Sequence, residues 1–362
     1  MGAVGRILAI IVVVVLGLGA AFYFLGPKTA SRSQTLEIER PAATVLARLA
    51  STPVGSTVVE GVTTAEAASV EGDTVTAPVT FADGGTGHVS YRVTENGDGS
   101  RVEVKLDEDL GPNPMNRFAA FTGGDVAPLI ASAATLVETD LNALPNASFA
   151  GLNYSVVQVE GHPFFYVENC SDSDAESITS IISQAVVAIP PVMRQNRLTV
   201  NGDLMAVEPR VVSNQYCYQV GYPYQGQQPR ALLIGKTGQT PSGTALRVVY
   251  TGTEADVIAQ VYDPMDALLA AAHLDDPATR DDDWVTYEVY HDDPTQEGGS
   301  RNREIFYVTQ GDISALTRIA PPTEEAAAPA PEAQPAEAPA ETTEAPAAEE
   351  APAPTPEPAT TP

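Results

Sequence analysis

The chain has 362 residues, of which 43% are hydrophobic, and a formal net charge of −28. This length allows two ordinary domains, and the apolar share is enough for a packed core. The acidic excess argues against nucleic acid and against anionic lipid surfaces as partners, because both are recognised through Lys and Arg. Two Cys and four scattered His form no metal-binding motif, so we predict neither a metal nor another cofactor.

The N-terminal segment is predicted to be a membrane anchor, residues 1–33. Residues 7–25 carry no charge and have about the length that crosses ~30 Å of hydrocarbon as a helix. A cleaved signal peptide has a shorter apolar core that ends in small residues, whereas this one ends in Phe-Tyr-Phe-Leu. Basic residues flank both ends, so orientation rests on the short N-terminal flank, which usually stays inside. We expect a single pass through the inner (cytoplasmic) membrane, with the body in the periplasm.

The C-terminal segment, residues 321–362, consists almost wholly of Pro, Ala, Glu and Thr, with twelve prolines and nine glutamates. Proline prevents regular structure, and the glutamates repel one another. We predict a disordered, extended acidic tail with polyproline II character. It is interpreted as a solubilising spacer, and a docking tail for a specific partner is the alternative.

Residues 34–148 predict an α+β domain. Alternating runs rich in Val, Thr and Tyr predict strands at 36–40, 74–81, 87–95 and 100–106. Gly- and Asn-rich connections join the last three as hairpins. Residues 42–50 predict a short helix, and Asp125 is a candidate N-cap for a longer one. Its apolar stripe comprises Val126, Leu129, Ile130, Ala133, Leu136, Val137 and Leu141.

This domain resembles the START-like superfamily, also called SRPBCC or polyketide cyclase-like. The resemblance rests on the run from Ile38 to Leu46, the Gly85 to Gly87 hairpin, and the run from Leu110 to Phe118. It implies a helix-grip fold, in which an antiparallel sheet surrounds one long helix with an apolar cavity between them. Residues 52–73 depart from the family, because its tryptophan-bearing strands are hard to find there.

Residues 149–320 predict one unit used twice, each with two strands, a helix and two more strands. The first half has strands at 154–160, 164–168, 204–207 and 216–222, and its helix is expected to stop or kink at Pro190-Pro191. The second half has strands at 231–234, 245–251, 284–290 and 303–309, and its helix, 254–273, is expected to kink at Pro264. Two related halves predict a pseudo-twofold domain with a cleft between them.

This second domain resembles the GyrI-like small-molecule-binding domain, the effector-binding module of AraC-type and MerR-type regulators. The resemblance rests on the runs from Leu246 to Thr253, from Tyr287 to Thr295 and from Arg303 to Val308. It implies a ligand in the cleft, walled by aromatic rings, with a glutamate on the last strand facing it. That glutamate corresponds to Glu304, which can pair with a cation or act as acid/base, as in the family's hydrolytic branch. No helix-turn-helix precedes the domain, which argues against a transcription factor.

Five residues are predicted to bind the ligand: Glu304, Trp284, Tyr287, Tyr290 and Phe306. Strand alternation places Glu304 and Phe306 on one face of the last strand, and Trp284 and Tyr290 on one face of the strand before it. A carboxylate beside aromatic rings can bind a cation or transfer a proton. A solvated strand-edge glutamate and ordinary core packing of the rings are the alternatives. No catalytic residue is predicted.

Two further features have open interpretations. Cys170 and Cys217 lie in the same half and could form a disulfide outside the cytoplasm, if their Cα separation allows it. The acidic runs 281–283 and 291–293 are interpreted as solvated turns rather than as metal ligands.

The leading functional hypothesis is a membrane-anchored, small-molecule-binding protein that senses or sequesters a hydrophobic or cationic ligand. One alternative is a hydrolase of a reactive small molecule that uses Glu304 as acid/base. The sequence has no nucleophile motif such as GxSxG, which disfavours the enzyme. The other alternative is a non-catalytic envelope interaction protein that uses the acidic tail.

Overall fold

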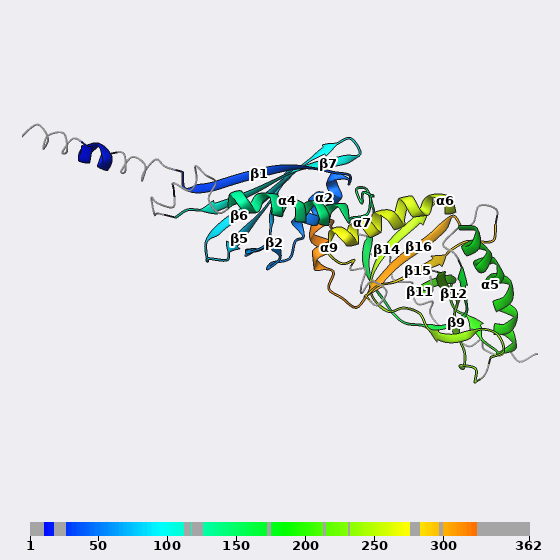
Figure 1. Ribbon diagram of the computed structural model, residues 1–362. Coiled ribbons are helices and arrows are strands. Elements are labelled where there is room, and N and C mark those ends of the chain that lie inside the picture. Colours follow the sequence, from blue (N-terminus) through cyan, green and yellow to red (C-terminus); the bar gives the residue numbers. More distant parts are fainter. Residues whose placement is uncertain are drawn as a thin grey trace, which may run out of the picture. The chain divides into compact units, whose positions relative to one another are not determined.

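The computed structural model describes residues 11–17, 27–111, 117, 126–171, 175–212, 215–230, 232–275, 283–296 and 300–323. These residues form the predicted α+β fold, with two curled antiparallel sheets (Figure 1). Within the predicted anchor, residues 11–17 are helical with exposed side chains, and the rest of that segment lies outside the described residues. The predicted tail also lies outside them from residue 324 onward.

The first sheet has the strand order β1-β7-β6-β5-β3-β2, with β4 paired to β5. Its strands are β1 (Thr29–Ile38), β2 (Thr57–Val59), β3 (Val62–Thr64), β4 (Ser69–Glu71), β5 (Thr74–Phe81), β6 (Thr86–Asn96) and β7 (Gly99–Asp109). The predicted strands and both hairpins are therefore present. The stretch 52–73, for which no strands were predicted, forms the three short strands β2, β3 and β4.

Two helices pack on this sheet, α2 (Ala42–Ala50) and α4 (Val126–Asn142). The apolar stripe of α4 packs against β1, β2 and β7 and is buried except for Leu129, which is half-buried, and Leu136, which is 50% exposed. The candidate N-cap Asp125 lies outside the described residues. A sheet around one long helix is the arrangement expected from the sequence, and membership of the START-like superfamily stays a prediction.

The second sheet has the strand order β13-β9-β12-β11-β15-β16-β14-β8, with β10 paired to β12. Its strands are β8 (Ser155–Val159), β9 (Pro163–Ser171), β10 (Thr199–Val200), β11 (Leu204–Val212), β12 (Gln215–Gln225), β13 (Lys236–Gln239), β14 (Gly243–Thr251), β15 (Val285–Tyr290) and β16 (Asn302–Thr309). The halves meet where β11 pairs with β15. Each half also lends its first strand to the other, because β8 pairs with β14 and β13 pairs with β9. Between residues 155 and 309, two strands, a helix and further strands follow one another twice, as predicted, with the two-residue strand β10 added in the first half.

Helices cover one face of this sheet: α5 (Ala175–Gln195) in the first half and α6 (Glu254–Val257) with α7 (Asp263–Ala271) in the second (Figure 1). A short C-terminal helix, α9 (Ser314–Ile319), was not predicted. Helix α5 was expected to stop or kink at Pro190-Pro191. It does not stop there, because it continues to Gln195. Ile189 and Met193 are fully buried in the core on either side of the prolines, and their packing holds the last turns in place.

The helix of the second half, predicted at 254–273 with a kink at Pro264, is interrupted rather than simply kinked. Residues Ile258–Tyr262 form a π-helical turn directly before Pro264, which stands in the first turn of α7. Proline has no N–H and is tolerated at such a position, so starting a new helical segment there avoids a broken hydrogen bond inside a helix. The turn also places Tyr262 over the sheet, where its hydroxyl bonds to Glu288.

The predicted strand at 231–234 is wrong. Residues 232–235 are irregular, and the strand starts at Lys236, where β13 pairs with β9. Gly235 adopts φ +82°, a left-handed conformation that a strand cannot contain. Its backbone lies so close to the Phe165 ring that an added Cβ would come within 2.6 Å of Cζ. Because the backbone of Gly235 passes so close to the Phe165 ring, the strand begins only at Lys236.

Cys170 and Cys217 form a disulfide, with 4.0 Å between their Cα atoms. The two residues stand directly opposite each other in the antiparallel pair of β9 and β12. This register resolves the pairing that the sequence left open.

The chain divides into two compact units, Met1–Glu324 and Glu325–Pro362. The second unit lies outside the described residues, and a boundary near residue 148 inside the first stays a prediction. Within the first unit, Arg48 of α2 donates to the carbonyl of Ala270 at the end of α7 (2.8 Å) and pairs with Asp140 of α4 (2.6 Å).

In the part of the chain that the structure describes, one helical segment is long and apolar enough to cross a membrane. It is Ser177–Gln195, inside α5. One face of this helix packs on β9 and β12, as a core helix also does, so its length and composition alone do not assign it to a membrane.

Candidate functional site

The two last strands of the second sheet bring Glu304, Tyr287 and Phe306 to the face that the helices leave open. Tyr287 pairs directly with Phe306 across β15 and β16, and Val289 pairs with Glu304. Residues opposite each other in an antiparallel pair share a face. The Tyr287 and Phe306 rings stack with centroids 4.5 Å apart and an interplanar angle of 8°. Three of the five predicted site residues therefore lie together.

The other two predicted residues, Trp284 and Tyr290, lie on the opposite face of the sheet, beneath the helices. The Trp284 indole donates to the carbonyl of Leu274 (2.9 Å), next to the end of α7. Tyr290 packs in the core under α5. The structure therefore does not bring these two rings to Glu304, and Trp284 is not placed to report on a ligand there.

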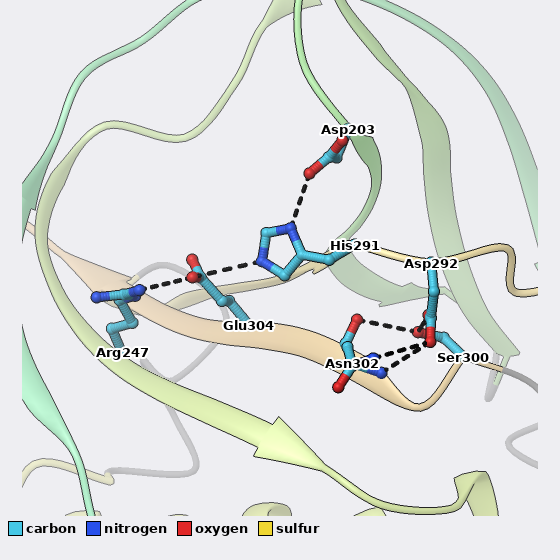
Figure 2. Close-up of polar contacts among 7 residues, drawn as sticks. All are labelled: Asp203, Arg247, His291, Asp292, Ser300, Asn302 and Glu304. Atoms are coloured by element: carbon cyan, nitrogen blue, oxygen red, sulfur yellow. Dashed lines mark hydrogen bonds and ion pairs between the residues drawn. The ribbon is translucent and has the colours of Figure 1, made fainter. Parts of the chain in front are cut away.

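Four ionisable side chains form a continuous row that includes Glu304 (Figure 2). Arg247 on β14 donates to Glu304 Oε1 over 2.6 Å. His291, just after β15, places Nε2 at 3.4 Å from the same oxygen, and its Nδ1 lies 2.7 Å from Asp203 Oδ2. Each residue lies on or next to a different strand of the second sheet, and the strand order β11-β15-β16-β14 makes these strands neighbours.

The row opens to solvent at one end. The exposed fractions of the side chains are 19% for Glu304 and 20% for Arg247, but 39% for His291 and 53% for Asp203. Glu304 is thus reachable yet partly desolvated, which strengthens electrostatic interactions relative to bulk water.

The charges of the row act on the ionisation of their neighbours. Burial opposes protonation of His291, but the hydrogen bond to Asp203 and the negative charge of Glu304 outweigh it, so the pKa of His291 is raised above 6.5. Burial, and next the negative charge of Glu304, raise the pKa of the Tyr287 phenol well above 10. Tyr287 is therefore a neutral hydroxyl at physiological pH.

The turn after β15 holds His291 in place. Asp292 accepts hydrogen bonds from the Ser300 hydroxyl and from the backbone N–H groups of Arg301 (3.0 Å) and Asn302 (3.1 Å), as Figure 2 shows in part. The backbone N–H of His291 donates to the Asn302 carbonyl (3.0 Å). The run 291–293 is therefore more than the solvated turn predicted from sequence, because its first residue belongs to the row and its second anchors the turn.

Three members of the row were not predicted: Arg247, His291 and Asp203. Alternation through Tyr287 and Val289 places position 291 on the Glu304 face, so His291 could have been found by continuing the pattern past the strand end. For the other two residues the sequence carries no comparable signal. Arg247 lies 57 residues before Glu304, and Asp203 lies 88 residues before His291.

Within the described ranges, no group of three or more His, Cys, Asp or Glu side chains could hold a metal ion. The row offers two carboxylates, a guanidinium and an imidazole as its chemical groups. These can bind a charged or hydrogen-bonding ligand, or move a proton through His291.

No protein-family model matches the sequence, and no curated protein matches it. Solved structures that resemble part of the chain include SAV2435 bound to tetraphenylphosphonium, with 10% identity over 44% of this chain and 95% of that one and a TM-score of 0.31. They include the EcmrR C-terminal domain, with 12% identity over 44% of this chain and 98% of that one and a TM-score of 0.30. A Listeria innocua hydrolase encoded by lin2189 shares 12% over 48% of this chain and 95% of that one, with a TM-score of 0.29. Likenesses of this size carry no activity or ligand over to this chain.

Proposed function

We propose that this protein is a membrane-anchored module that binds a hydrophobic or cationic small molecule at the row formed by Asp203, His291, Glu304 and Arg247. The observation that carries the proposal is the partly exposed row beside the stacked rings of Tyr287 and Phe306. Both rings are buried, with 6% of each residue exposed, so a ligand would contact the charged groups beside them rather than the ring faces.

The charge balance of the row favours a cation. Asp203 and Glu304 carry two negative charges, and Arg247 carries one positive charge, so the row is net negative while His291 is neutral. A bound cation must compete with Arg247 for Glu304, or extend the row beside it. The strongly acidic chain adds a long-range attraction for cations and repels anions.

The location proposed for this module is the inner membrane, with the body in the periplasm. The Cys170–Cys217 disulfide supports a body outside the cytoplasm, because disulfides persist in oxidising compartments and are rare in the reducing cytosol. The charge-free stretch 7–25 supports the anchor.

Calorimetry on the full chain in nanodiscs of zwitterionic lipid tests the binding. Tetraphenylphosphonium serves as the hydrophobic cation and triphenylphosphine oxide as a neutral analogue, with empty nanodiscs subtracted. We expect the cation to bind more tightly, and Glu304→Gln to weaken it by about 1–3 kcal/mol, the usual scale of a charge-assisted contact. Glu37→Gln is the matched control, because Glu37 is also an ion-paired glutamate on a strand but belongs to the first sheet, away from the row.

The proposal fails if Glu304→Gln binds the cation as tightly as the parent, or if the neutral analogue binds equally well. A second candidate function is a hydrolase, and the observation that favours it is His291 between two carboxylates, an arrangement that can serve a general base. Loss of ester turnover in Glu304→Gln with unchanged cation binding would replace the binding function with that activity.

A further inference from the structure

A hollow lies at the first-half end of the second sheet, away from the row. It has a volume of about 370 Å³ and is bounded by β9, α5 and the irregular segment before β13. Val167, Ala185, Ala188 and Ile234 form its apolar walls. Ligand pockets typically have volumes of about 300–1,000 Å³. The hollow is therefore large enough for a small organic molecule.

The hollow exists because small residues stand where larger ones would fill it. Ala185 and Ala188 present single methyl groups from α5, and Gly235 presents none. Gly235 cannot be replaced without strain, because its φ is +82° and a Cβ would meet the Phe165 ring. Opposite them, Ile234 leaves 54% of its surface exposed instead of packing across the gap. The chain thus holds an apolar wall open to solvent.

The rim of the hollow is polar and electrically neutral. Lys236 of β13 pairs with Glu168 of β9 over 2.9 Å, and the side-chain amides of Asn169 and Gln184 complete the polar lining. A ligand with a single charge would attract one member of the ion pair and leave the other without its partner, which costs affinity. A neutral donor and acceptor can bond to the amides and leave the pair intact.

We propose that this hollow is a second binding site, for a neutral amphiphile with an apolar ring or short chain and a hydrogen-bonding end. The apolar part lies on Val167, Ala188 and Ile234, and the polar end lies at the rim beside Asn169 and Gln184. Its chemistry differs from that of the row, which is net negative while His291 is neutral and which we propose to select for positive charge. The protein therefore has two sites with different ligand classes on one domain.

Three probes with one ring system test the proposal: naphthalene-2-carboxamide, the naphthalene-2-carboxylate anion and the 2-naphthylmethylammonium cation. Binding is measured by calorimetry on the full chain in nanodiscs, with empty nanodiscs subtracted and with salt added to screen the net charge. We expect Ala188→Phe, which fills the hollow, to weaken binding of the amide at least ~10-fold, about 1.4 kcal/mol or more. Val187→Phe is the matched control, since Val187 is the adjacent, 74% exposed residue and does not line the hollow.

Glu304→Gln should leave amide binding unchanged, which separates this site from the row. The two charged probes should bind the hollow at least ~10-fold more weakly than the amide. If Ala188→Phe fails to fold, Ile234→Asp, at an exposed position of the apolar wall, replaces it and should also weaken binding. The proposal is overturned if the amide does not bind the parent, if it binds the filled and control variants equally, or if the carboxylate binds the hollow as tightly as the amide.

Discussion

Two glutamates one strand apart show how position decides what a residue can do. Glu288 faces the helices, where Arg303, with none of its side chain exposed, bonds to it over 2.9 Å and Tyr262 donates a further hydrogen bond. Glu304 faces the open side and pairs with Arg247 near solvent. Both are carboxylate–guanidinium pairs, but Arg303 is fully buried in the first, whereas the side chain of Arg247 is 20% exposed in the second. The first is a structural network, in which removal of one partner would strand a buried charge.

His291 gives the row a pH dependence. Its pKa is raised in the folded protein, so its protonation stabilises the fold fully below the unfolded pKa of 6.5, and that contribution is lost as pH rises through the folded pKa. We predict that the stability advantage of the parent over His291→Gln is larger at about pH 5.5 than at about pH 8.5, measured by urea unfolding. The difference should be small, because the side chain is 39% exposed and screened by water.

The same protonation adds positive charge beside Glu304, so binding of the hydrophobic cation should tighten as pH rises through the folded pKa of His291. His162→Gln, which removes an exposed histidine just before β9, is the control for both measurements. If the stability advantage of the parent over His291→Gln instead grows toward alkaline pH, the prediction that folding raises the pKa of His291 is wrong.

At the scale of elements, the helices and strands depart from local rules where tertiary packing opposes them. Helix α5 continues past two prolines because Ile189 and Met193 anchor it in the core. The segment 232–235 is not a strand because Gly235 must pass over Phe165. In both cases burial of apolar side chains outweighs intrinsic propensity, which is a weak preference by comparison.

The disulfide should make a large contribution to the stability of the second sheet. It closes a loop with a sequence separation of 47 between Cys170 and Cys217. The chain-entropy relation gives about 4 kcal/mol for a loop of this length, within the usual range of 2–5 kcal/mol. We predict that the double variant Cys170→Ser/Cys217→Ser lowers the free energy of unfolding by roughly this amount, measured by urea unfolding.

Dithiothreitol is the control for this prediction, since it should destabilise the parent and leave the double variant unchanged. If the parent and the double variant unfold at the same urea concentration, the disulfide does not form in the protein or does not constrain its unfolded state.

At the scale of the whole molecule, the proposed anchor and the disulfide lead to one predicted topology. We predict that the N-terminus lies inside and the body outside, so that alkaline phosphatase fused after Pro362 is active and a fluorescent protein that folds only in the cytoplasm is dark at the same position. The physical reason is that a short N-terminal flank usually stays inside while the longer chain is translocated. Fluorescence without phosphatase activity would reverse the orientation and remove the compartment in which Cys170 and Cys217 are expected to pair.

The sequence by itself determined the class of the fold and the residues that share a face. Helix α2 and strand β5 have the predicted bounds, and between Ser155 and Thr309 two strands, a helix and further strands follow one another twice, as expected. Alternation also places Glu304 with Phe306, and Trp284 with Tyr290. These features follow from periodicities of 2 and 3.6 residues, which are local and need no knowledge of what a strand pairs with.

Only the tertiary structure decided which faces meet. The register between β15 and β16 puts Tyr287 beside Phe306 and leaves Trp284 and Tyr290 on the other side, so two of five predicted site residues lie away from Glu304. Arg247 reaches Glu304 from β14, which is distant in sequence but pairs with β16, and Asp203 reaches His291 from the start of β11, which pairs with β15. Pairing depends on the summed burial of two sheet faces and not on any local pattern, which is why Arg247 and Asp203 could not be found before the strands were assembled.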